Sequence, residues 1–157
     1  MKERKWLLMG AVFLCLVLFL GVFRVQTIAA FTRMKDWENV VEVEIMRHCA
    51  EDTAVLHLEE NEGIAAVAAM MEETKCKFDG IYFSTIRFQG TAAEWKVYDV
   101  TFFGENNAVL GRFMAAQDGS VYIDGRKYIL TNDYEKETVA DFLDGVIEKY
   151  QQQVKVL

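Results

Sequence analysis

The chain has 157 residues, of which 52% are hydrophobic and 26% are charged, and its formal net charge is −7. This composition excludes a disordered acidic tail, a collagen-like repeat and a low-complexity polymer, and the length allows one ordinary domain. An acidic chain lacks the clustered Lys and Arg that neutralise phosphates, so we expect no nucleic-acid partner.

The first notable feature is an apolar run over residues 6–23, eighteen residues without a charge or a strong helix breaker. As a helix it covers roughly 27 Å, close to the ~30 Å hydrocarbon core of a bilayer. The run therefore predicts a transmembrane signal anchor over 6–23, with the lipid bilayer as its partner. A cleaved secretory signal is the alternative, but its apolar region usually has about 7 to 15 residues, and Arg24 separates this run from any cleavage point near Ala29 or Ala30.

Basic residues flank the apolar run on both sides, with three in residues 1–5 and three in residues 24–35. The leading cluster is denser and lies closer to the run. The positive-inside rule then favours a single-pass protein of the cell membrane, with a basic cytoplasmic start (1–5) and an extracytoplasmic C-terminal domain.

Residues 24–35 are expected to connect this anchor to an acidic body. Residues 36–157 carry eleven Lys and Arg against twenty-three Asp and Glu, a net charge of −12. Such a body would be repelled by anionic headgroups, so we expect a tethered globule that does not lie flat on the membrane.

The body opens with a predicted hairpin. Residues 41–47 alternate apolar and polar side chains with period two, the pattern of a half-buried strand, and residues 54–60 repeat the alternation. A turn over 50–53 joins them if Cys49 faces Ala54, because the inward side chains of both strands then coincide.

A helix and two strands are predicted next. The helix begins after Asn61 and runs through an alanine-rich stretch to about Lys75. Residues 81–89 and 94–103 are rich in aromatic and β-branched side chains, which favour strands. We expect these two strands to pair across the break at 90–93.

Short strands over 109–116, 121–123 and 126–130 complete a predicted meander, and Asp124-Gly125 is the strongest hairpin signal in the chain. The last segment, 133–152, repeats apolar residues at helical spacing and predicts a long amphipathic helix that covers the sheet.

The start of that helix resembles a capping box, with Asn132 as N-cap and Glu135 three residues later. Residues 151–157 are expected to fray.

These elements predict an α+β fold. It consists of a single N-terminal transmembrane helix followed by a small domain over 36–157. That domain has a curved antiparallel meander sheet of about seven strands, one helix after the first hairpin and a long C-terminal helix.

The search for chemistry finds no phosphate-binding Gly-rich loop, GxSxG, HExxH or CxxC motif, so we expect no catalytic residue and no cofactor. His48 and His57 fall on the outward face of the first hairpin, with Glu44 and Glu59 near His57. This arrangement suggests a two-histidine, two-carboxylate cation site. The solvent face of an acidic hairpin gives the same pattern without diagnostic spacing, and we therefore predict no metal site.

Three aromatic side chains on predicted strands, Trp95, Phe102 and Tyr128, are the candidate surface for a ligand or partner. Ordinary core packing and β-propensity are the preferred explanation of these aromatic residues. The adjacent acids Glu59-Glu60 and Glu72-Glu73 are interpreted as solvated or helix-end residues, because a glycosidase pair would face across a cleft.

Cys49 and Cys76 lie outside the apolar run and are candidates for a disulfide if the body faces an oxidising compartment. Two buried free thiols are the preferred interpretation of these residues.

The functional hypothesis is an extracytoplasmic interaction or regulatory module without catalytic activity, with a protein partner in or near the membrane. The alternative is a small-molecule or lipid-binding domain with an apolar cavity between the curved sheet and the C-terminal helix.

Overall fold

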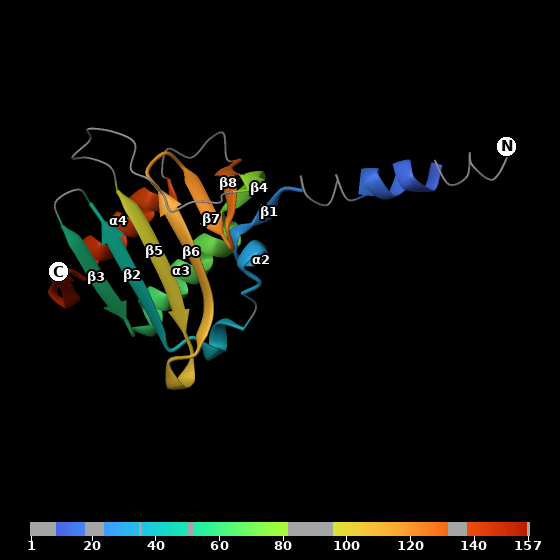
Figure 1. Ribbon diagram of the computed structural model, residues 1–157. Coiled ribbons are helices and arrows are strands. Elements are labelled where there is room, and N and C mark those ends of the chain that lie inside the picture. Colours follow the sequence, from blue (N-terminus) through green and yellow to red (C-terminus); the bar gives the residue numbers. More distant parts are fainter. Residues whose placement is uncertain are drawn as a thin grey trace.

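The computed structural model describes residues 9–17, 24–34, 36–49, 52–81, 96–131 and 138–156. Within these residues, nine strands form one antiparallel sheet in the order β1-β4-β8-β7-β6-β5-β2-β3-β9 (Figure 1). The strands are β1 (Gln26–Thr27), β2 (Glu42–His48), β3 (Thr53–Leu58), β4 (Lys75–Ile81), β5 (Val97–Phe103), β6 (Val109–Ala116), β7 (Ser120–Ile123), β8 (Arg126–Leu130) and β9 (Val154–Val156). The helices are α2 (Ile28–Thr32), α3 (Asn61–Glu73) and α4 (Val139–Lys149), with the short 3-10 helices η1 (Trp37–Asn39), η2 (Glu105–Asn107) and η3 (Gln151–Gln153). Residues 9–17 are helical as well.

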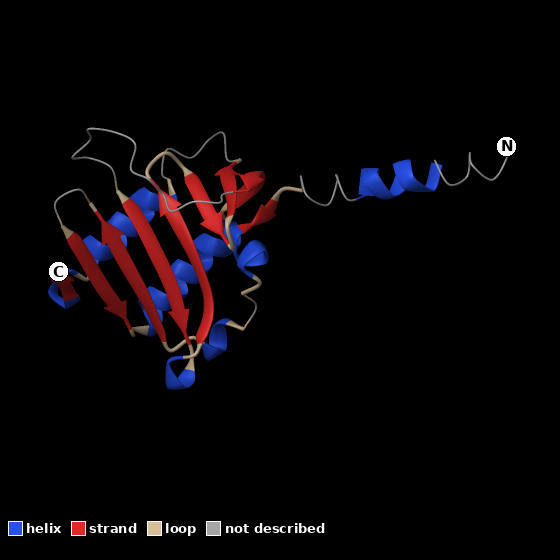
Figure 2. Cartoon of the chain, in the orientation of Figure 1, coloured by secondary structure: helices blue, strands red, loops and turns tan. Residues whose placement is uncertain are grey.

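The sheet has two chemically different faces, because side chains alternate along each strand. One face, here called the inner face, carries the buried side chains of Val43, Ile45 and Val100, and it is covered by α3 and α4 (Figure 2). The opposite face, here called the outer face, carries Glu44 of β2 and His57 of β3. Both long helices therefore cover the same face and leave a polar one opposite.

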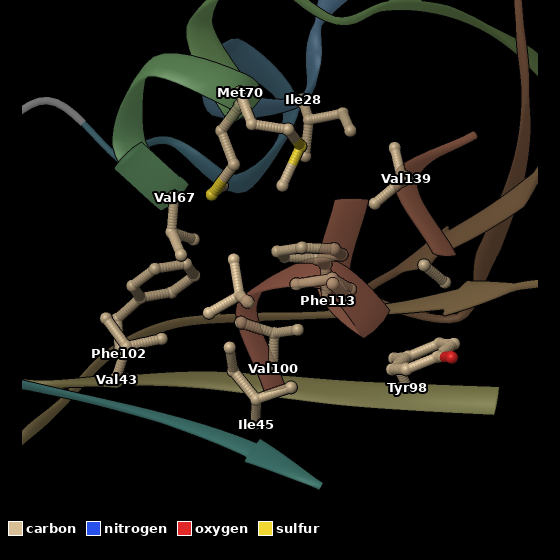
Figure 3. Packing of buried hydrophobic residues seen from close by; sticks show 14 of the residues in the cluster. Ile28, Val43, Ile45, Val67, Met70, Tyr98, Val100, Phe102, Phe113 and Val139 are labelled. Atoms are coloured by element: carbon tan, nitrogen blue, oxygen red, sulfur yellow. The ribbon is translucent and has the colours of Figure 1, made fainter. Parts of the chain in front are cut away.

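The core lies between the inner face and the helices. The rings of Phe102 and Phe113 are 6.2 Å apart, with Val67 and Met70 of α3 above the sheet (Figure 3). Each large side chain that is fully buried in this way stabilises the fold by roughly 1.5 to 3 kcal/mol.

The tight turn at Asp124-Gly125 connects β7 and β8 as predicted, with Ile123 paired to Arg126. Asp124 has φ 49° and Gly125 has φ 72°. Positive φ at both central residues is the type I′ geometry, whose twist matches that of the flanking strands.

The segment expected to be a connector, residues 24–35, contributes to the core. The hydroxyl of Thr27 caps α2 by accepting a hydrogen bond from the Ala30 N–H, and Ile28 is fully buried. The Phe31 ring lies 4.3 Å from that of Tyr128. The folded body therefore begins before Asp36.

The predicted long helix over 133–152 is wrong. The C-terminal helix α4 has eleven residues, and its capping box is formed by Thr138 and Asp141. Residues 132–137, which hold the expected cap, lie outside the described residues. The chain after α4 does not fray but forms η3 and then β9, which pairs with β3.

The predicted count of about seven strands is also wrong, partly because β4 was missed. The helix α3 ends at Glu73, and Lys75, Cys76 and Lys77 then alternate between exposed and buried positions. Strand β4 pairs with β1 and β8. Most of the predicted strand 81–89 lies outside the described residues.

The structure contradicts the predicted transmembrane anchor. The described part of this run, residues 9–17, is helical. Among the residues that were described, no helix combines the length and the apolar character that crossing a membrane requires. The prediction of a single-pass anchor, and of the extracytoplasmic location inferred from it, is therefore wrong. Residues 6–8 and 18–23 lie outside the described residues.

Candidate functional site

A pocket of about 620 Å³ lies at the end of the sheet where β2 begins and β5 ends. Four glutamates provide most of its charge. The described residues that line it are Glu42, Glu44, His57, Glu59, Glu60, Phe103, Asn107, Gln153 and Lys155. We call this set the acidic pocket.

The hairpin β2–β3 supplies the central side chains of the acidic pocket. Even-numbered residues of β2 point to the outer face, so Glu42 and Glu44 share it with His57 of β3. The expected pairing of Cys49 with Ala54 is wrong by two residues, because Glu44 and not Met46 lies opposite His57. A shift of two leaves every side chain on its predicted face.

The imidazole of His57 is held between two carboxylates. Its Nδ1 lies 2.6 Å from Oε1 of Glu42, to which it donates when the carboxylate is ionised. Its Nε2 lies 3.9 Å from Oε2 of Glu44. These contacts fix the ring within the pocket and leave further oxygens of both carboxylates available for a ligand.

The two histidines do not come together. His48 is at the far end of β2, where its Nδ1 lies 3.5 Å from the Thr53 hydroxyl. Four residues of strand, about 13 Å, separate it from Glu44. Across the described ranges, no group of three or more His, Cys, Asp or Glu side chains has a geometry suited to a metal ion.

An aromatic ring completes one wall of the acidic pocket. Phe103 is paired with Glu42 across the β2–β5 ladder and is half-buried on the outer face. Because directly paired side chains have Cβ atoms about 4.5 to 5.5 Å apart, the ring lies beside the carboxylate. A cation drawn in by the glutamates thus meets an aromatic surface as well.

Gln153 and Lys155 line the opposite wall and come from the C-terminal segment 151–157, for which the prediction of a frayed end is wrong. The signal that pointed to them is the alternation Val154-Lys155-Val156, with a lysine between two valines. Three residues are too short a pattern to identify a strand without its neighbour β3.

The aromatic residues proposed as a surface do not form one. Phe102 is fully buried and Tyr128 is 3% exposed. Both belong to the core on the inner face of the sheet, and Trp95 lies outside the described residues. Strand alternation could not reveal which face the helices cover.

The two cysteines are free thiols, Cys49 half-buried and Cys76 fully buried. Five inter-strand steps separate β4 from β2, a distance of about 24 Å at ~4.8 Å per step. A disulfide needs Cα atoms within about 7 Å, so this sheet does not allow the Cys49–Cys76 bond.

A second polar cluster lies on the inner face, where Asp144 of α4 meets the sheet. Its carboxylate accepts hydrogen bonds from Lys96 Nζ at 2.5 Å and from Arg47 at 3.4 Å. The Tyr98 hydroxyl nearby is buried and makes no hydrogen bond of good geometry. Burial raises the pKa of Tyr98, and Asp144 raises it further. This cluster ties α4 to β2 and β5, and we interpret it as structural.

The adjacent acids at the end of α3 do not form a pair that faces a cleft. The Glu72 carboxylate accepts a hydrogen bond from the Trp37 indole at 2.8 Å. Glu73 is exposed in the last turn of the helix. Glu59 and Glu60, by contrast, both line the acidic pocket.

Comparisons with protein-family models, with curated proteins and with solved structures find no match for this chain.

Proposed function

We propose that the protein is a non-catalytic binding module whose acidic pocket takes up an arginine-containing basic segment of a partner protein. The observation that carries this proposal is the composition of the pocket, in which four glutamates and Phe103 line one open depression of the surface. Carboxylates recognise a guanidinium through charge-assisted hydrogen bonds, and an aromatic face attracts it through its quadrupole.

The charge of the body supports the same ligand. Residues 36–157 have a net charge of −12, so their field attracts cations and speeds encounter with a basic segment. Within the acidic pocket, Lys155 offsets only part of the four negative charges. The negative charge therefore speeds the encounter with a basic ligand and also stabilises the bound complex.

The volume of the acidic pocket and the chemistry of its lining also favour ligand binding over catalysis. The volume of about 620 Å³ falls within the roughly 300 to 1,000 Å³ of typical ligand sites. The described lining contains no Ser, Thr or Cys, so it offers neither a hydroxyl nor a thiol nucleophile for a base to activate. His57 is instead held by Glu42, a contact that orients it.

The alternative of an apolar cavity between sheet and C-terminal helix is not carried further. Within the described residues, most of that space is filled by the buried cluster that includes Phe113, Leu143 and Ile147. A lipid or other apolar molecule would have to displace these side chains. The pocket of about 450 Å³ beside the start of α4 is lined partly by polar residues, among them Glu73, Thr74 and Thr138.

The experiment is calorimetric titration of the full-length chain with a capped hexa-arginine peptide. Glu44→Gln combined with Glu59→Gln removes two charges from the acidic pocket without altering the His57–Glu42 hydrogen bond. We expect Kd to rise about tenfold, because each lost ion pair at a half-exposed site contributes up to ~1 kcal/mol.

A matched control separates the acidic pocket from general charge. Glu73→Gln combined with Asp124→Asn removes the same charge from exposed positions just before β4 and in the β7–β8 turn, and these strands lie three or more inter-strand steps from β2. We expect a change in Kd of less than about twofold, since exposed charges a Debye length away are screened. If both double variants weaken binding equally, or if the unaltered chain does not bind the peptide, the proposed function is wrong.

A further inference from the structure

The C-terminal strand β9 places a cation on the wall of the acidic pocket. Lys155 is paired with Val55 of β3, which puts its side chain on the outer face, the face that carries His57. The same strand direction brings the preceding Gln153 toward the pocket, where its amide donates to the Glu60 carboxylate. The end of the chain is thus built into the site.

This segment is attached to the body by a small number of contacts. Three residue pairs join β9 to β3, and Val154 packs partly against the core. Val156 at the end of the strand is 69% exposed. The segment forms the outermost strand at this edge of the sheet (Figure 1).

The ammonium group of Lys155 has the chemistry of the ligand we propose. Among the ion pairs formed by described residues, none involves Lys155, although four glutamates line the same pocket. A lysine stem reaches about 6 Å from its backbone, so the charge samples the space beside those carboxylates. It therefore competes with an incoming cation for the same negative potential.

We propose that Lys155 is an internal competitor for the acidic pocket, so that the C-terminal strand regulates how tightly the basic segment binds. This inference rests on the proposed function, because it concerns the affinity of that site for a cation. Any event that removes the Lys155 charge or lifts β9 from β3 increases that affinity.

The test compares Lys155→Met with Lys77→Met in calorimetric titrations of the full-length chain with capped hexa-arginine. Methionine keeps an unbranched apolar stem beside Val55 and removes the charge. Lys77 is exposed on β4, at the other end of the sheet. We expect Kd to fall about three- to tenfold for Lys155→Met at low ionic strength and to change less than about twofold for Lys77→Met.

Two further measurements make the outcome decisive. Lys155→Arg keeps the charge and is expected to bind like the unaltered chain. Amide hydrogen exchange of β3 and β9 checks that the strand stays paired in every variant. If the unaltered chain binds and Lys155→Met binds no more tightly than Lys77→Met, this inference is wrong while the proposed function stands. If no variant binds the peptide, both are wrong.

Discussion

The Asp144 carboxylate links helix α4 to the sheet through ion pairs with Lys96 and Arg47. Burial alone would raise the pKa of its carboxyl, but hydrogen bonds from Lys96 and Arg47, together with the charge of Lys96, outweigh burial and lower the pKa. The folded protein thus prefers the ionised carboxylate more strongly than the unfolded chain does. Such a group stabilises the fold fully above its unfolded pKa and loses that effect as pH falls through its folded pKa.

Asp144→Asn is therefore expected to lower the free energy of unfolding by about 2 kcal/mol at neutral pH, because two half-buried cations lose their counter-ion. The difference from the unaltered chain should persist down to about pH 4 and shrink below it, as the wild-type carboxyl is protonated. Urea unfolding across this range measures it. Asp36→Asn, at an exposed position, is the control, and a penalty for Asp144→Asn that is constant down to pH 2 would contradict the assignment.

At the scale of elements, the pair β1–α2 shows how a short segment becomes part of the core. Strand β1 has two residues and α2 has five, and neither would be stable alone. They are held because Ile28 is fully buried and its N–H donates to the Thr74 carbonyl at 3.1 Å. Tertiary contacts, and not local propensity, make this segment a strand and a helix.

Removing N-terminal residues tests whether β1 and α2 are needed for the stability of the fold. Removal of residues 1–35 deletes Ile28, Ala29 and Met34 from the core, and losing even one large buried aliphatic side chain costs about 2 to 5 kcal/mol. We expect that fragment to unfold without cooperativity or at a much lower midpoint, and a fragment lacking only residues 1–23 to unfold cooperatively. Thermal unfolding followed by near- and far-UV circular dichroism compares them; equal midpoints would show that β1 and α2 are dispensable.

At the scale of the whole molecule, strand order decides whether Cys49 and Cys76 can form a disulfide. The order β4-β8-β7-β6-β5-β2 keeps Cys76 and Cys49 apart, although both lie at or near strand ends. Burial raises the pKa of the Cys76 thiol to about 12. A thiol with so high a pKa is almost entirely protonated at neutral pH, and the thiolate is the reactive form.

We therefore expect Cys76 to resist maleimide in the folded protein at pH 8 and to react once the chain is unfolded. Labelling followed by peptide mass spectrometry, with and without denaturant, measures each cysteine separately, and the exposed Cys15 serves as the internal control. Labelling of Cys76 in the folded state as fast as that of Cys15 would contradict its burial. A reductant should not change the number of labelled thiols, since no bond joins Cys49 and Cys76.

Part of the acidic pocket can be predicted from local sequence, and the rest depends on pairing between strands that are far apart in the chain. Alternation alone predicts that the glutamates of β2 and His57 share one face, and a register error of two residues does not change that face. The other walls needed long-range pairing. Phe103 arrives by the β2–β5 ladder, and Lys155 arrives by the β3–β9 ladder. The sequence could not show that these strands are neighbours.

The sequence by itself determined the acidic character of the body, the two hairpins β2–β3 and β7–β8, and the inward and outward side chains of their strands. These features depend on side-chain alternation and turn chemistry, which act over a few residues. Only the tertiary structure decided the strand order, the burial of Ile28, the length of α4 and the return of Lys155 to the acidic pocket. Each of these depends on contacts between residues far apart in the chain, whose energy is gained only when the whole sheet assembles against its helices.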